Sequence, residues 1–306
     1  MNSVNHLSKY ICVCLVITAM VWLSDFTGNA EIIFPEIAAI CIGGFLAPKL
    51  VWKTDWLRMF ICIMICAISG VLIVTYVPQP LWVQVSLAFV VGNMVLMLSG
   101  TTFVPMISAI ALPVLIQTKS PVYIISAGIF TLVVILFRIM LEKAGEKEKE
   151  EYIPVKWKFG KSEIFRTIIA AAFAYVVIGF GWKFCVAPPL LVAFTEMVTS
   201  KDGSRKKRIK AAVLVTCCSL AGAAVRYLFI IKLGISPALG ALVISIVIIL
   251  LVKAVGICYP PAGAMAVLAM LIPDSAVLLY PIQVFAGIGI FAICAEIYEK
   301  VIKCRN

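Results

Sequence analysis

The stretch Pro261-Ala-Gly-Ala-Met-Ala-Val-Leu268 is a short apolar run that begins with proline, and Pro105-Met-Ile-Ser-Ala-Ile-Ala-Leu112 resembles it in the first half of the chain. Outward from these two runs, one order of elements recurs. The order found between Pro35 and Lys143 is found again between Pro188 and Lys300. A repeat of this length predicts two pseudo-symmetric halves, and duplicated membrane domains are most often transporters or channels.

Further correspondences extend the repeat on either side of these runs. Phe34-Pro35-Glu36-Ile37-Ala38-Ala39 corresponds to Ala187-Pro188-Pro189-Leu190-Leu191-Val192. Arg58 and Ser69 correspond to Arg208 and Ser219. We therefore divide the chain into a first membrane repeat (1–143), a charged cytoplasmic linker (144–162) with an exposed stretch around Pro154, and a second membrane repeat (163–306).

The composition is that of a polytopic membrane protein. Of the 306 residues, 63% are hydrophobic and 13% are charged. Several apolar runs approach the ~20 residues that cross a bilayer. The formal charge of +11 comes from basic residues clustered between apolar runs, so it indicates topology and contact with anionic headgroups. It does not indicate nucleic acid as a partner.

The fold class that we predict is all-α, with two parallel repeats. Each repeat should hold about four long transmembrane helices and two short half-helices that begin with proline. The short segments are Pro35–Leu50, Pro105–Ile116, Pro188–Thr199 and Pro261–Ile272. At 1.5 Å per residue they reach only ~18–24 Å, whereas the hydrocarbon core is ~30 Å thick.

The basic clusters orient the chain. They lie at Lys9, Lys49–Arg58, the linker, Lys201–Lys210 and Lys300–Arg305. Placing all of them in the cytoplasm requires an even number of crossings in each half, so both halves point the same way. An inverted arrangement would place the six basic residues of the fourth cluster outside. We expect a plasma-membrane protein with both termini in the cytoplasm.

This topology makes the short segments the expected binding site. Their proline-initiated N-terminal ends should meet near mid-membrane, where irregular backbone survives only if it is buried in protein or lines a wet cavity. Each helix start carries roughly half a positive charge and unpaired N–H groups. Together they predict an anion site.

A resemblance supports the same site. Tyr259-Pro260-Pro261-Ala262-Gly263-Ala264-Met265-Ala266 resembles the His-Pro-Pro-Ala-Gly-Ala-Thr-Ala signature of the HPP family of integral membrane proteins. Tyr259 replaces the histidine of that signature, and Met265 replaces a threonine. The resemblance implies a transporter-like membrane fold, and some family members are linked to nitrite movement across organelle membranes.

The candidate substrate-binding residues lie at the starts of the half-helices: Pro35, Pro105, Pro188, Pro189, Tyr259, Pro260, Pro261, Ala262, Gly263 and Ala264. Close helix packing explains the small residues equally well, and a proline at a helix start needs no function. Glu196 is the candidate proton-coupling group, or it reaches the cytoplasmic surface. Arg226 either draws anions inward by its field or extends to headgroups. Glu36 either caps its helix or lies in an outer vestibule.

The remaining chemistry argues against an enzyme. The 11 cysteines lie mostly inside apolar runs as packing residues, and the single histidine leaves no metal set or nucleophile–base pair. We expect no cofactor and no metal. The partners are the bilayer and a small solute, and a homo-oligomer is compatible with the sequence.

The function that we expect is transport or channelling of a small solute, with an inorganic anion such as nitrite or nitrate preferred. The alternatives are a non-transporting membrane scaffold that uses the basic cytoplasmic loops, and a transporter of an organic solute. A cationic or neutral organic solute predicts an acidic or aromatic-lined cavity, and an anion predicts a positive one.

Overall fold

The computed structural model describes residues 7–149, 151–157, 159–200 and 204–303, and this part of the chain is built from twelve α-helices with short 3-10 and π segments. Eight helical segments are long and apolar enough to span a membrane. They are α1 (Leu7–Thr27), α3 (Trp56–Tyr76), α4 (Leu81–Ser99), α6 (Pro121–Lys143), α7 (Lys161–Gly179), α9 (Arg205–Val225), α10 (Pro237–Val255) and α12 (Tyr280–Ile297). The predicted all-α polytopic membrane fold is confirmed.

The other four helices are the short segments that the sequence predicts. They are α2 (Glu36–Cys41), which continues as a π turn over Ile42–Leu46, α5 (Pro105–Ile116), α8 (Pro188–Thr199) and α11 (Pro260–Leu268). Proline occupies the first turn of α5, α8 and α11, where its missing N–H costs no helical bond. None of the four is long enough to cross ~30 Å alone.

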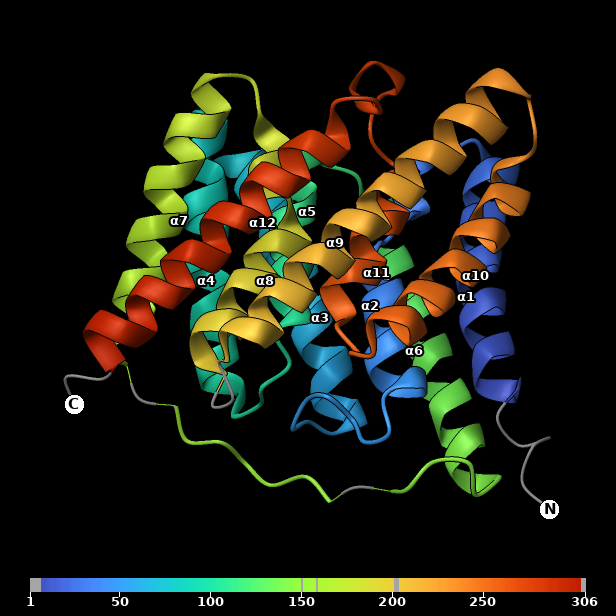
Figure 1. The fold of residues 1–306 in the computed structure, drawn as a ribbon, viewed down its shortest axis with the longest axis horizontal. Coiled ribbons are helices and arrows are strands. Elements are labelled where there is room, and N and C mark those ends of the chain that lie inside the picture. The colour runs from blue at the N-terminus through green and yellow to red at the C-terminus, as the bar shows by residue number, and fades with distance from the viewer. Residues whose placement is uncertain (1–6, 150, 158, 201–203, 304–306) are drawn as a thin grey trace.

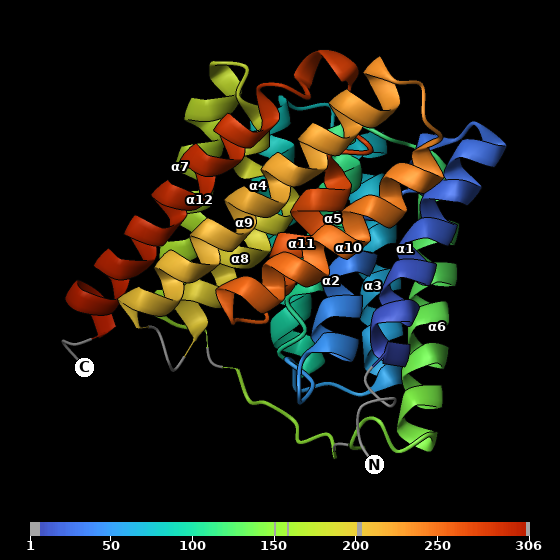
Figure 2. The same ribbon diagram turned by 45° about the vertical axis from the view of Figure 1, so that its right-hand side comes forward.

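The two halves point in the same direction. The start of α1, the segment between α6 and α7, and the end of α12 lie on one face in both views (Figures 1 and 2). We call this the linker face and the opposite one the far face. α2 and α8 lead toward the linker face, and α5 and α11 lead toward the far face.

Matching contacts recur in the two halves. The Tyr123 hydroxyl of α6 donates to the Ala109 carbonyl of α5 over 2.8 Å, and the Tyr280 hydroxyl of α12 donates to the Met265 carbonyl of α11 over 2.6 Å. Each tyrosine also meets a phenylalanine edge-on: Phe34–Tyr123 at 5.8 Å and Phe184–Tyr280 at 5.6 Å between ring centroids. Descent from one duplicated unit would produce this geometry, and the duplication stays a prediction.

The half-helices pack across the boundary between the halves. α2 of the first half lies against α11 of the second, and α5 lies against α8. Within each half, a glycine lets a long span approach a half-helix closely: a Cβ at Gly70 of α3 would lie 2.4 Å from the Ile110 carbonyl oxygen of α5, and one at Gly222 of α9 would lie 2.2 Å from that of Ala266 of α11. Small residues let membrane helices approach in this way.

The linker stretch around Pro154 is exposed, as predicted, and hydrogen bonds also hold it to the bundle. The Tyr152 hydroxyl and the Val155 amide both donate to the Gly100 carbonyl, over 2.8 and 2.7 Å. The Trp157 indole N–H donates to the Thr101 carbonyl over 2.7 Å. The linker is therefore bound to the turn between α4 and α5, because that turn offers carbonyls that no helix uses.

The fourth basic cluster, Lys201–Lys210, differs from the loop that the sequence predicts. Residues 201–203 lie outside the described part, and from Arg205 onward the basic residues belong to α9 itself. Ser204 caps this helix by accepting a hydrogen bond from the Lys207 amide.

Candidate functional site

The N-terminal turns of α2 and α5 meet inside the bundle, and the first turn of α11 lies against the C-terminal end of α2. Ser108 in the first turn of α5 donates its hydroxyl to the Glu36 carboxylate at the start of α2. Gly263 in the first turn of α11 packs against Ile42, and its Cβ position lies 3.5 Å from the Ala38 carbonyl oxygen of α2. The α5–α2–α11 group thus joins helices that lead to opposite faces.

α8 joins the same group through α11. The Tyr259 hydroxyl, at the residue before α11, donates to the Ala193 carbonyl in the middle of α8 over 3.2 Å. α8 also lies against α5. The four half-helices therefore form one central cluster.

The sequence predicts unpaired N–H groups at the starts of the half-helices. For the amides whose hydrogen bonds are described below, this prediction is wrong. Pro105, Pro188 and Pro260 have no N–H to offer. The next amides are used in short turns: Ile107 N–H to Val104 O at 2.9 Å, Leu190 N–H to Ala187 O at 2.8 Å, and Ala262 N–H to Tyr259 O at 3.1 Å. What remains at these ends is the positive pole of the helix dipole.

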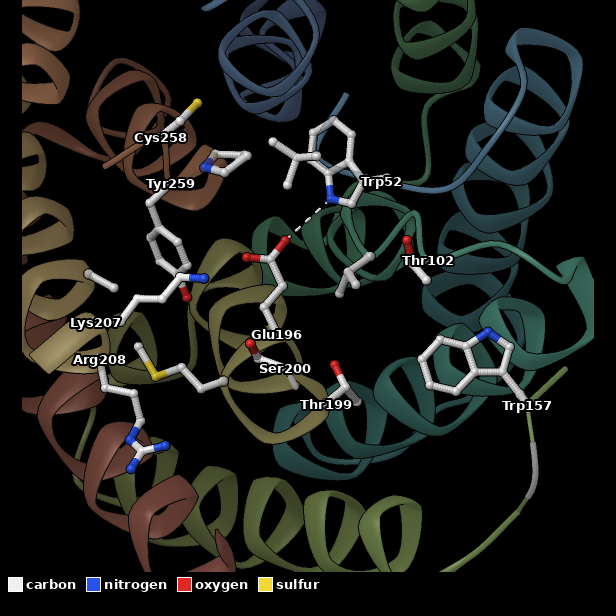
Figure 3. A pocket seen from close by; sticks show the side chains of 15 residues that line it. Trp52, Thr102, Trp157, Glu196, Thr199, Ser200, Lys207, Arg208, Cys258 and Tyr259 are labelled. Atoms are coloured by element: carbon white, nitrogen blue, oxygen red, sulfur yellow. Dashed lines mark hydrogen bonds between the residues drawn. The ribbon is translucent and has the colours of Figure 1, made fainter. Parts of the chain in front are cut away.

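A cavity of about 320 Å³ opens beside this cluster on the linker face. Its wall includes Val104 and Tyr259, the residues that precede α5 and α11, so the starts of two half-helices border one space. The remaining lining comes from the end of α8, the start of α9, the loop between α2 and α3, the turn between α4 and α5, and the linker. Its polar and aromatic members include Trp52, Thr102, Trp157, Glu196, Thr199, Ser200, Lys207 and Arg208 (Figure 3).

Glu196 is the carboxylate of this cavity. It is half-buried near the end of α8, and its Oε1 accepts a hydrogen bond from the Trp52 indole N–H over 3.3 Å (Figure 3). Among the described residues Glu196 forms no ion pair. Glu196 thus lies on the wall of a cavity that opens on the linker face, and its proton-coupling role stays a prediction.

Two cations also border the cavity, and they differ in their surroundings. Arg208 forms an ion pair with Glu299 over 2.6 Å and is largely buried. Lys207 is exposed at the rim, near the Tyr259 ring (Figure 3). Lys207 is thus the cation that a solute entering from the linker face meets.

Of the predicted substrate-binding residues, Tyr259 and Pro260 line the cavity. The others are buried in the packing of the half-helices and lie outside its lining: Pro35, Pro105, Pro188, Pro189, Pro261, Ala262, Gly263 and Ala264. Close packing, the alternative explanation of the small residues, describes their surroundings in this structure.

Arg226 lies away from the cavity, at the C-terminal end of α11. Its guanidinium donates to the Met270 carbonyl and, over 3.2 Å, to the Ala269 carbonyl, and it pairs with Asp274 over 2.7 Å. These carbonyls follow the last turn of α11, so Arg226 caps that helix end.

Sequence reasoning missed Trp52, Thr102 and Trp157. The two tryptophans lie in otherwise polar, basic segments, and an aromatic residue there is the signal that could have identified them. Thr102 carries no such signal, since its place follows from packing: its hydroxyl and amide are hydrogen-bonded to the Lys53 backbone in the loop between α2 and α3.

Comparisons with protein-family models, with curated proteins and with solved structures find no match for this chain. The resemblance to the HPP family stays a prediction.

Proposed function

We propose that the protein is a transporter or channel that passes a small solute through the cavity beside the half-helices. The supporting observation is that the starts of α5 and α11, two helices that lead to the far face, border one cavity that opens on the linker face. A solute in this cavity has already passed the polar surface and lies next to the central cluster. We place the linker face in the cytoplasm of a plasma-membrane protein, because the basic segments gather there.

The solute that we propose first is an inorganic anion such as nitrite or nitrate. The starts of α5 and α11 contribute the positive ends of their helix dipoles, and Lys207 contributes a full charge at the rim. Glu196 opposes them when ionised. A protonated Glu196 leaves the cavity positive, so an anion and a proton would enter together.

The size of the cavity suits a small solute. Since a water molecule occupies about 30 Å³ of liquid, a space of about 320 Å³ holds a small anion with part of its hydration shell. Thr199, Ser200 and Trp157 border the same space. The Thr199 hydroxyl donates to the Thr195 carbonyl, and the Trp157 indole N–H donates to the Thr101 carbonyl.

A second candidate follows from the same lining. Trp52, Trp157 and Tyr259 share the cavity lining with an ionisable carboxylate, and aromatic faces with a carboxylate attract organic cations. An ionised Glu196 would then bind the positive group of an amine. The charge of Glu196 in the loaded state separates the two candidates.

The test is solute flux in proteoliposomes, with nitrite, nitrate, formate, chloride and a small amine, with and without a pH gradient. Lys207→Gln should reduce anion flux several-fold. Lys206→Gln, which removes the same charge one residue earlier, outside the cavity lining, should not. Equal effects of the two variants would remove Lys207 and the cavity rim from the route. Protein-dependent amine flux without anion flux would select the second candidate.

A further inference from the structure

A second carboxylate lies deeper than the cavity. The side chain of Glu36 is 1% exposed, and it begins α2 directly after Pro35. Its Oε1 accepts the hydrogen bond from Ser108, whereas its Oε2 is buried without a hydrogen-bond partner. No lysine, arginine or histidine of the described residues pairs with it.

The contact between Glu36 and Ser108 lies in the interior of the bundle. It joins the first turn of a half-helix that leads to the linker face to the first turn of one that leads to the far face. Glu36 is therefore separated from both faces by the lengths of these helices, and it is absent from the lining of the cavity that holds Glu196.

The groups around Glu36 offer no compensating charge. α1, α5, α6 and α11 pack against α2. The titratable groups that these elements and α12 bring near are the hydroxyls of Tyr123 and Tyr280, and the thiols of Cys12 and Cys41 lie farther along α1 and α2. Both tyrosine hydroxyls already donate to backbone carbonyls.

An isolated carboxylate in this position is expensive to keep ionised. A charged side chain at the bilayer centre costs ~2.5–3.5 kcal/mol on insertion scales, and such residues are rare unless they have a function. Protonation removes this cost and places the proton on Oε2, the atom without a partner. Ionisation is then favoured only when water or a solute reaches the site.

The second half shows that the fold does not need these two polar groups. In the alignment of the short runs, Glu36 corresponds to Pro189 and Ser108 corresponds to Ala264. Carboxylate and hydroxyl are thus absent together from the copy, although the half-helices there pack in the same manner. Glu36 and Ser108 are present together in the first half and absent together from the second, which indicates that the two side chains act together.

We propose that Glu36 is a proton-binding site inside the bundle, separate from Glu196, with Ser108 as its hydrogen-bonding partner. The proton binds to Oε2 and leaves to water when the half-helices part. That this proton couples to solute movement rests on the proposed transport function. The protonation itself does not.

Infrared difference spectroscopy of proteoliposomes during a pH change tests this directly, because a protonated carboxyl group has its own C=O band. We expect a band that titrates in the wild type, is lost in Glu36→Gln, remains in Glu196→Gln and shifts in frequency in Ser108→Ala. A wild-type spectrum that matches that of Glu36→Gln at every pH would overturn the proposal. So would a Glu36 band that never titrates, since the group would then be a permanently neutral packing residue.

Folding and transport are checked separately. If Glu36→Gln does not fold, the frequency of the titrating band in Ser108→Ala decides the assignment: a shift supports Glu36, and an unchanged band overturns it. In flux assays, Glu36→Gln should abolish accumulation driven by a pH gradient and keep downhill flux. A wild type without any flux removes the proposed function, while the infrared assignment still stands or fails by itself.

Discussion

Replacing Gly222 by alanine should destabilise the protein, because the added methyl group has no space. An ideal Cβ there would lie 2.2 Å from the Ala266 carbonyl oxygen and 3.0 Å from the carbonyl carbon. The obstacle is the backbone of the buried half-helix α11, which cannot rotate away as a side chain would. Overpacking of this kind costs ~1–3 kcal/mol.

Alanine also recovers part of this cost, since it is favoured over glycine in a helix by at most ~1 kcal/mol. The matched control is Gly289→Ala on α12, where nothing lies within 4 Å of the added Cβ. We expect a net loss of about 1–2 kcal/mol for Gly222→Ala, and a neutral or slightly stabilising effect for Gly289→Ala.

The assay is thermal unfolding of the purified protein in detergent, followed by the loss of its monodisperse elution peak. Gly222→Ala should unfold at a lower temperature than the wild type, and Gly289→Ala should not. Equal midpoints for the two variants would contradict the close approach of α9 to α11, and with it the central packing of the half-helices.

Three further outcomes are expected. Burial, and after it the nearby Arg138 charge, lowers the pKa of Lys147 from 10.5 to about 8. Between these two pH values the unfolded state therefore binds more protons than the folded state. Stability should therefore rise with pH in this window, and Lys147→Met should flatten the rise in a pH series of unfolding midpoints. Arg226→Met should cost about 1–3 kcal/mol through the lost cap of α11, whereas Asp274→Asn, whose side chain is 66% exposed, should cost less than about 1 kcal/mol in the same unfolding assay. In intact cells an impermeant maleimide should label a cysteine placed at Lys119 on the far face but not one placed at Lys49 on the linker face, and the reverse pattern would contradict the orientation.

The helices were predictable because their signals are local. Long apolar runs define the spans, and a proline marks the start of each short one, so α5 and α8 have the predicted bounds. The even number of crossings in each half follows from the basic clusters, and the common face of the start of α1, the linker and the end of α12 agrees with it.

The details of register and packing were not predictable in the same way. Pairing Ser69 with Ser219 aligns Gly70 with Leu220, whereas the structure gives the matching close approach to Gly222. The alignment can be off by two residues without any sign in the sequence, because the residues along a membrane span are nearly all apolar and resemble one another. A single sequence contains no signal that α2 packs on α11 of the other half.

The site likewise contains residues that the sequence identified and residues that only the structure reveals. Tyr259 and Glu196 could be identified from a motif and from a lone acid in an apolar run, and both line the cavity. Trp157 belongs to it only because the linker is bound along the linker face. The expectation of unpaired amides at the helix starts was wrong for these amides, because prolines and tight turns leave few donors there, and the anion site stays a prediction.

The proposed transport function is decided by anion flux into proteoliposomes that hold the purified wild-type protein, compared with empty liposomes. The empty control is needed because nitrous and formic acids cross lipid unaided. We predict protein-dependent uptake of nitrite or nitrate that an inward proton gradient increases and that Thr199→Trp, on the cavity wall, blocks. Folded protein that moves neither anion nor amine under any gradient would contradict the proposed function.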